Sequence, residues 1–457
     1  MNHHLRLAAV PVYLVLCLLL GGASAAGFWA NLFLQLTGLG LILWSLVAVR
    51  RTPMGAPGRQ LVALMALMLV IALVQLVPLP PSVWTKLGGR EMVVTGYKLL
   101  GQDLPWLPIS LAPHKTLASI LWLIPSVAVL LGTVKLGAFK PNWIAWSLAV
   151  VTILSVGVGA MQLAGGTQSP WYFYEITNYG VAVGFFSNAN HEATLLVATV
   201  PFLAALYLAA TVKGRSAQHA SGMLVILLGA LMVLIVGVAI NGSLAGVGLA
   251  VPVVAASGLM LLSRRRRVPG WLAGLLAALA LACVYIPFSA PLGNNLTTAE
   301  AKSSPYSRYT SFAHSIEAAR DFAPFGSGIG TFVDLYPAYE DADAIDRTYV
   351  NHVHSDYIEL ALETGVPGLL LLLIFLIWWV GRVIAVWQTE KPDYFARAAS
   401  IASAAILAHS IVDYPLRTAA ISALFAVCVA LMAEPRPRAR RREEPPRENR
   451  ARHLSAD

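Results

Sequence analysis

Histidine and carboxylate side chains are concentrated in one run near the end of the sequence, Asn351-His352-Val353-His354-Ser355-Asp356-Tyr357-Ile358-Glu359, which continues to Glu363. This density is notable in a chain of which only 12% is charged. Histidine suits general-base chemistry, because its ordinary pKa lies near neutrality. His354 is therefore our candidate base, and Asp356 or Glu363 is a candidate carboxylate to orient it. A histidine that only hydrogen-bonds a loop is the alternative.

A helical piece over 352–363 would place His352, Asp356 and Glu359 on one face, because residues three or four apart are neighbours on a helix. His352 is thus a second candidate contact for a substrate. A His-x-His pair can also bind a metal, but neither a cysteine nor a third spaced histidine lies nearby. We therefore predict no metal and no cofactor.

Three glycines alternate in the stretch from Pro324 to Phe332, at Gly326, Gly328 and Gly330. Glycine allows a tight backbone path that can approach a ligand closely. Gly328 and Gly330 are candidate substrate contacts on this ground, and a plain structural turn is the alternative. No strand followed by a helix surrounds them, so the pattern does not predict a dinucleotide site.

The elements that must position these residues are apolar helices. Hydrophobic residues make up 57% of the 457 residues, and the mean hydropathy is +0.68. Crossing a bilayer takes about 20 apolar residues. We predict an all-α integral membrane protein with about twelve spans, at 5–25, 28–49, 60–80, 115–134, 143–163, 190–211, 221–240, 244–262, 270–290, 366–387, 398–412 and 417–433.

Basic residues predict the orientation of these spans, since Lys and Arg are enriched in cytoplasmic loops. The strong basic clusters all follow even-numbered spans, so both termini are predicted to be cytoplasmic. Three large loops then lie on the other side, at 81–114, 164–189 and 291–365. We divide the chain into a membrane domain, 1–433, which includes the candidate catalytic loop 291–365, and a basic tail, 434–457. The tail lacks apolar residues and is predicted to be disordered.

The order of the motifs resembles the O-antigen ligase and polysaccharide polymerase superfamily. The resemblance rests on Arg308, the glycine stretch, and the pattern His354-Ser355-Asp356-Tyr357-x-Glu359-x-x-x-Glu363-x-Gly365-x-x-Gly368. Three flanking segments agree with it, and together the matching features cover roughly 100–430. These segments are Phe186-Ser187-Asn188-Ala189-Asn190-His191, Pro108-Ile109-Ser110-Leu111-x-Pro113-x-x-Thr116 and His409-Ser410-x-x-Asp413-Tyr414-Pro415-Leu416-Arg417.

The resemblance implies a membrane glycosyltransferase of a GT-C-like fold in the bacterial inner membrane. Its donor would be a glycan on undecaprenyl diphosphate at the periplasmic face, and its acceptor a further glycan or lipid A–core. The reaction would be metal-independent and inverting, in the biosynthesis of lipopolysaccharide, exopolysaccharide or capsule. Nucleic acid is not an expected partner, because the net charge of +9 sits in patches between apolar stretches and in the tail.

A diphosphate donor gives the arginines a role, because a guanidinium donates two parallel hydrogen bonds to phosphate oxygens. Arg308 is our first candidate for that contact, in a predicted helix over 308–321. Arg320, Arg347 and Arg417 are weaker candidates, since each could instead be a structural ion-pair partner. Asn188 and Asn190 could bind sugar hydroxyls or simply cap a helix.

One position departs from the family pattern. Members often have an arginine at the mouth of a middle span, and Leu244 occupies that place here. Its absence favours a polymerase or a divergent transferase over a ligase. The alternative function is a multi-spanning secondary transporter or flippase of a polysaccharide precursor. Transporters tend to place polar groups at the middle of the bilayer, whereas here the ionisable residues gather in one outer loop.

Overall fold

The computed structural model describes residues 3–48, 54–211, 217–262, 308–340, 350–390 and 392–434, together with helical positions at 271, 274 and 278. These residues form helices and no strand; the one β-bridge joins Leu79 and Leu107. The predicted all-α class is confirmed for the described residues. The tail beyond Glu434 and the predicted span at 270–290 lie outside them, apart from the three isolated helical positions.

Eight helices among the described residues are long and apolar enough to cross a membrane. The predicted total of twelve spans remains a prediction. The eight are α2 (Phe28–Val47), α3 (Ala56–Val74), the stretch Pro113–Leu136 made of α6 (Pro113–Trp122), α7 (Ile124–Leu131) and a π-helical turn, α8 (Pro141–Ala164), α9 (Ala189–Ala210), α10 (Ala217–Asn241), α11 (Leu244–Leu262) and α16 (Asp356–Gln388). Three shorter helices accompany them, α1 (His3–Leu20), α17 (Tyr394–His409) and α18 (Ala419–Ala433).

Local sequence explains where several of these helices begin. Pro141 opens α8 and Pro113 opens α6. The first turn tolerates proline, because proline lacks an N–H group and an N–H at that position would have no partner within the helix. Asn188 caps α9 by accepting a hydrogen bond from the amide of Asn190. Asp393 caps α17 in the same way, through the amides of Phe395 and Ala396.

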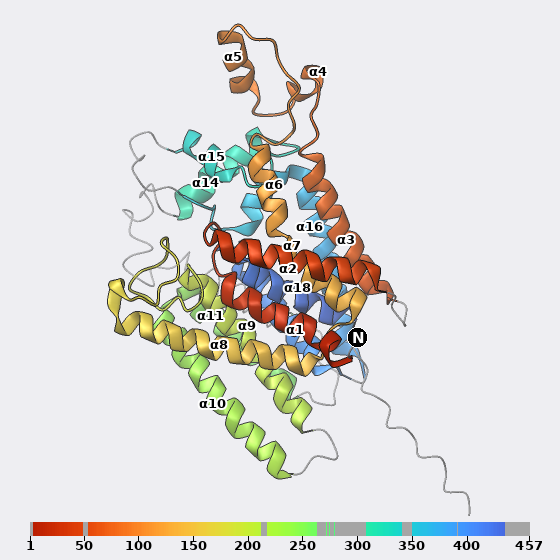
Figure 1. Cartoon of the computed structure of the whole chain (residues 1–457), viewed down its shortest axis with the longest axis vertical. Helices are drawn as coiled ribbons and strands as arrows, with labels where there is room; N and C mark the ends of the chain where they lie inside the picture. The colour runs from red at the N-terminus through yellow and green to blue at the C-terminus, as the bar shows by residue number, and fades with distance from the viewer. Residues whose placement is uncertain are drawn as a thin grey trace, which may run out of the picture.

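The central helix of the bundle is α9, which packs against α8, α10, α11 and α17. In its apolar window 78% of the residues are buried, against 6% in α16. A second group of contacts joins α18 to α1, α7 and α17. Figure 1 shows α10 at the margin of this bundle, and most of the apolar window of α16 is likewise not buried. Their exposed leucines, isoleucines and valines form the surface expected to face lipid.

The segments between the spans form a cap at one end of the bundle. Figure 1 shows α14 (Arg308–Asp321) and α15 (Phe332–Leu335) at the end away from the N-terminus, with α4 (Pro81–Trp84) and α5 (Glu91–Leu99) projecting beyond α3. The cap has its own apolar core, made of Ala318, Phe322, Phe332, Tyr336, Val353 and Leu362. The predicted helix over 308–321 is confirmed.

The helix α16 is broken inside. Gly365 has φ 58° and ψ −148°, so it separates a polar first segment from an apolar second one. The predicted boundary between the loop 291–365 and the span 366–387 falls at this break. The predicted helical piece over 352–363 is wrong at its start, because the helix begins at Asp356. His354 has φ 61°, a left-handed conformation that cannot continue into a helix.

Candidate functional site

The polar first segment of α16 is held in place by the turn between α17 and α18. The amide of Asp356 donates to the carbonyl oxygens of Ser410 and Asp413, at 3.0 and 3.2 Å. Ser355 is the N-cap, and its hydroxyl accepts from the amide of Ile358. Two segments more than 50 residues apart are thus joined at the first turn of α16. This junction brings the predicted histidine run against the predicted C-terminal motif.

Three carboxylates on one face of α16 converge on a single guanidinium. The Nε of Arg417 lies 3.7 Å from Asp356, and its Nη2 lies 3.3 Å from Glu359 and 3.0 Å from Glu363. All three acids are buried, while the arginine side chain is 22% exposed. Burial alone would lower the pKa of Arg417, but Glu359, Glu363 and Asp356 outweigh it and raise that pKa. The arginine therefore remains charged within this acid cluster.

Each carboxylate of the acid cluster also has a second partner. The hydroxyl of Ser410 donates to Asp356 at 2.7 Å. Glu359 lies 2.8 Å from Nδ1 of His352 and accepts from the amide of Val353 at 3.1 Å. Glu363 accepts from the amide of Gly330 at 2.7 Å. Buried charges need such hydrogen bonds in addition to an ion pair. The cluster therefore ties three segments to one helix face: the histidine loop (351–355), the glycine loop (324–332) and the turn between α17 and α18 (410–418).

The glycine loop wraps the end of the first segment of α16. Gly326, Gly328 and Gly330 all have positive φ, between 78° and 112°. The amide of Gly328 donates to the carbonyl of Glu363 at 3.0 Å. A Cβ on Gly326 would lie 2.5 Å from that same carbonyl oxygen. The two predicted substrate contacts, Gly328 and Gly330, thus direct their amides at Glu363, and their binding of a substrate stays a prediction.

His354 faces the ring of Tyr414. Its Nδ1 lies 3.1 Å from the carbonyl oxygen of His352. A carbonyl can only accept, so Nδ1 carries the proton and Nε2 carries the lone pair of the neutral ring. The ring of His354 meets that of Tyr414 edge to face, with centroids 5.1 Å apart. A general base at His354 requires this tautomer, with the proton on Nδ1.

Two further histidines contact the same tyrosine. The ring centroids of His352 and His191 lie 4.4 and 4.9 Å from that of Tyr414. The amides of Asn188 and Asn351 donate to its hydroxyl at 3.4 and 3.3 Å. Burial, with a contribution from the neighbouring Asp413, raises the pKa of Tyr414 to about 12. The phenol is therefore neutral near pH 7, in a polar cluster that three distant parts of the chain build.

The asparagine segment before α9 contacts this tyrosine cluster. Asn188 caps α9, which was the alternative prediction for this residue. Its side chain also donates to the hydroxyl of Tyr414. The side chain of Asn190 donates to Asp413 and accepts from the hydroxyl of Ser243 at 2.7 Å. His191 is fully buried, with Nε2 3.4 Å from Asp413. Binding of sugar by Asn188 and Asn190 stays a prediction.

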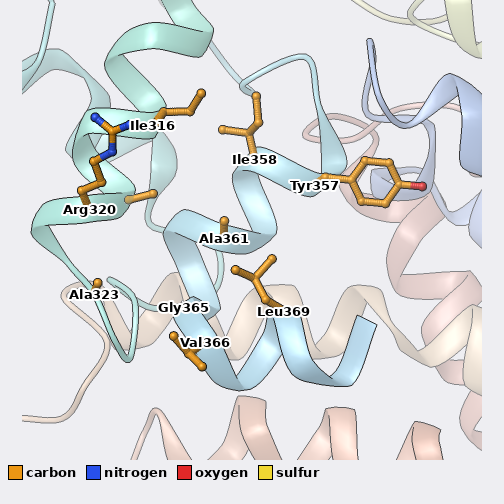
Figure 2. A pocket seen from close by; sticks show the side chains of 10 residues that line it. Ile316, Arg320, Ala323, Tyr357, Ile358, Ala361, Gly365, Val366 and Leu369 are labelled. Atoms are coloured by element: carbon orange, nitrogen blue, oxygen red, sulfur yellow. The ribbon is translucent and has the colours of Figure 1, made fainter. Parts of the chain in front are cut away.

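The other predicted arginines are placed as follows. Arg308 is the first residue of α14, but its side chain lies outside the described residues, as does all of Arg347. Arg320 is exposed on α14 and lines a pocket against α16 (Figure 2). Leu244, which replaces the family arginine, begins α11 and is 52% exposed. The proximity of Arg308 to His354 therefore stays a prediction.

Sequence reasoning did not anticipate the contacts of Tyr414 or the triple pairing of Arg417. The signal was present in the C-terminal motif, where Asp413, Tyr414 and Arg417 follow a histidine and a serine. Gln75 was also missed. Its side chain donates to the carbonyl of Glu363 at 2.8 Å and accepts from the amide of Ile329 at 2.9 Å. A lone glutamine at the end of an apolar helix carries no pattern that would reveal such a bridge.

Comparison with known proteins gives one family. The model described as "O-Antigen ligase" matches residues 228–373, a range that includes α14, the glycine loop, the histidine loop and the first segment of α16. No curated protein matches the chain significantly. The match confirms the resemblance seen in the sequence motifs.

Proposed function

Because the O-antigen ligase model matches residues 228–373, we propose that the chain is a member of the O-antigen ligase and polysaccharide polymerase superfamily and that it transfers or polymerises a glycan carried on undecaprenyl diphosphate. The acceptor is a hydroxyl of a growing glycan or of lipid A–core, at the periplasmic face of the inner membrane. The observation that carries this proposal is His354, whose Nδ1 bonds to a backbone carbonyl beside the acid cluster. The products would belong to O-antigen, exopolysaccharide or capsule assembly.

In this proposal His354 is the general base. Its Nε2 takes the proton of the acceptor hydroxyl as the oxygen attacks the anomeric carbon of the donor. The bond from that carbon to the diphosphate breaks, and the diphosphate leaves on the opposite side with inversion. The leaving group is already good, so the reaction needs charge stabilisation and a base rather than a metal.

The diphosphate is assigned to Arg308, with Arg347 as a further candidate. Two observations support giving it to Arg308 rather than to Arg417. The guanidinium of Arg417 faces three carboxylates of its own chain, so its donors are directed at protein. Arg308 begins α14, and α14 packs against α16. Arg417 then positions the carboxylate face of α16, and His352 contributes through its contact with Glu359.

The rival function, transport, predicts buried charges along the middle of the spans. The buried Asp, Glu, His and Arg side chains of the described residues are instead near helix ends or beside the break in α16. Asp356, Glu359 and Glu363 lie before the break in α16, and His409 and Asp413 lie at the turn after α17. Glu192 lies in the first turn of α9. This distribution supports a transferase at the membrane boundary.

The test begins with deletion of the gene and gel analysis of the surface glycan. Loss of ladder length is expected for a polymerase, and accumulation of unattached lipid-linked glycan for a ligase. Unchanged surface glycan would contradict both.

In purified protein, His354→Ala is expected to lower transfer about 10²–10⁴-fold. Arg308→Lys is expected to lower transfer as well, because a lysine cannot donate two parallel hydrogen bonds to a phosphate. Wild-type transfer by His354→Ala would end the assignment of the base.

A further inference from the structure

A pocket of about 330 Å³ lies between α14 and α16, on the side of α16 that faces away from the acid cluster. Helical spacing explains this arrangement. Tyr357, Ile358 and Ala361 fall on the face opposite to Asp356, Glu359 and Glu363, because each residue turns the helix by about 100°. Figure 2 shows the pocket with α14 on one side and α16 on the other. The body of α16 therefore separates the pocket from the candidate catalytic residues.

One end of the pocket is continuous with the lipid-facing surface of α16. Val366 and Leu369, which line the pocket, are 46% and 40% exposed. The same face continues with Leu370, Leu373 and Ile377, which are 54%, 53% and 66% exposed and follow at helical spacing. An exposed apolar stripe on a candidate span is expected to contact hydrocarbon. A molecule in this end of the pocket would therefore be an apolar chain from the bilayer.

The other end of the pocket carries a positive charge. Arg320 projects from α14 beside Ile316, away from Val366 (Figure 2). Within the described residues the guanidinium of Arg320 makes no hydrogen bond or ion pair. Of its acidic neighbours on α14, Asp321 accepts instead from the hydroxyl of Tyr339 at 2.9 Å. An exposed guanidinium at the edge of an apolar wall matches a phosphate joined to a hydrocarbon chain.

We propose that this pocket binds an anionic phospholipid of the surrounding membrane, with one acyl chain against Val366 and Leu369 and the phosphate on Arg320. This site goes beyond the proposed glycan transfer. The occupant is a bilayer phospholipid rather than the reacting donor, because α16 lies between the pocket and the acid cluster. Bound lipid would fill the space between α14 and α16 and so support the helix that Arg308 begins.

The experiment counts lipids bound to the purified full chain by native mass spectrometry. The protein is exposed in detergent to dioleoyl phosphatidylglycerol or to dioleoyl phosphatidylcholine. Wild type is expected to retain phosphatidylglycerol about fivefold better, from one cation near the lipid surface. Arg320→Gln should bind both lipids equally. Lys98→Gln, which removes an exposed cation on α5 outside the pocket, should keep the wild-type preference.

A second variant tests the apolar wall. Ala361→Trp fills the pocket and should lower retention of both lipids, even with Arg320 present; Ala319→Trp fills it from α14 if the first variant does not fold. An unchanged lipid count in a folded filled variant, or a retained preference in Arg320→Gln, would overturn the proposal. Displacement of phosphatidylglycerol by added undecaprenyl diphosphate at equal concentration would reassign the pocket to the donor. Because no glycan is transferred in these measurements, they stand apart from the test of the transferase.

Discussion

At the scale of residues, the site is built around one guanidinium that several carboxylates contact and one phenol ring that several histidines contact. Arg417 contacts three carboxylates, and Tyr414 contacts three histidine rings. His354, Asp356, Glu359 and Glu363 could be selected from the sequence, because ionisable groups are costly near a membrane and their density indicates function. Their partners could not, since Arg417 follows Asp356 by about 60 residues and only the tertiary fold brings them together.

Replacement of Arg417 should therefore destabilise the protein. Arg417→Gln leaves three buried carboxylates without their cation, and breaking a buried ion pair costs roughly 3–5 kcal/mol. Thermal unfolding in detergent should show a clearly lower midpoint for this variant. Arg320→Gln is the matched control, because its guanidinium has no ion pair within the described residues. Equal midpoints for the two variants would contradict the structural role of Arg417.

The tyrosine ring and its hydroxyl can be separated by two variants. Tyr414→Phe keeps the ring that contacts His354 and loses only the long hydrogen bonds of the hydroxyl with Asn188 and Asn351, so it should cost about 1 kcal/mol of stability and retain most transfer activity. Tyr414→Leu removes the aromatic wall and should lower the rate of transfer by more than Tyr414→Phe does. The kinetic constants should show this fall in kcat more than in KM, because the base and not the substrate loses its position. Equal rates would argue against a positioning role.

At the scale of elements, the sequence predicted where α16 changes from polar to apolar, but it did not predict that the helix is broken at that position. The length of the apolar run set the boundary near residue 365, and the change from polar to apolar residues is visible in the sequence. The broken helix could not be foreseen from Gly365 and Pro367, because glycine and proline also occur inside continuous transmembrane helices. The contact that fixes it is tertiary: a Cβ on Gly365 would lie 2.1 Å from the carbonyl oxygen of Pro324.

A glycine exchange in α16 tests the break. Gly365→Ala meets both a positive φ of 58° and that carbonyl, so it should lower stability by roughly 2 kcal/mol or more and also reduce transfer. Gly381→Ala lies in the same helix with no atom within 4 Å of the added Cβ. It should leave the unfolding midpoint unchanged or raise it slightly, because alanine favours a helix. Similar midpoints for both exchanges would show that the break is not required.

At the scale of the whole molecule, most helices agree with the apolar runs of the chain, and α11 has the predicted bounds, 244–262. Pro113–Leu136 differs, because its apolar run is built from α6, α7 and a π-helical turn rather than one regular helix. Pro125 and Gly132 interrupt that run, and Gly137 follows its end. Composition predicts the existence of a span but not its internal geometry, which depends on packing against α2 and α18.

The predicted orientation can be tested by cysteine labelling in cells. Cys17 and Cys428 are buried, and the native cysteines can be replaced by serine to lower the background. Ser303→Cys, in the predicted outer loop, should react with a membrane-impermeant maleimide added outside the inner membrane. Ser455→Cys, in the predicted cytoplasmic tail, should react only after the membrane is permeabilised. The reverse pattern would place the candidate site on the cytoplasmic side and refute the proposed function.

The pairing of α16 with Arg417 also has a consequence for biosynthesis. A nascent chain that has inserted α16 but has not yet produced the turn before α18 carries Asp356, Glu359 and Glu363 with no cation to neutralise them. The polar segment of α16 can then neither bury its acids nor fix the histidine loop. If the chain is the proposed transferase, we expect it to be inactive until its last helices are in the bilayer, and we expect prematurely terminated chains to be recognised by membrane proteases as unassembled.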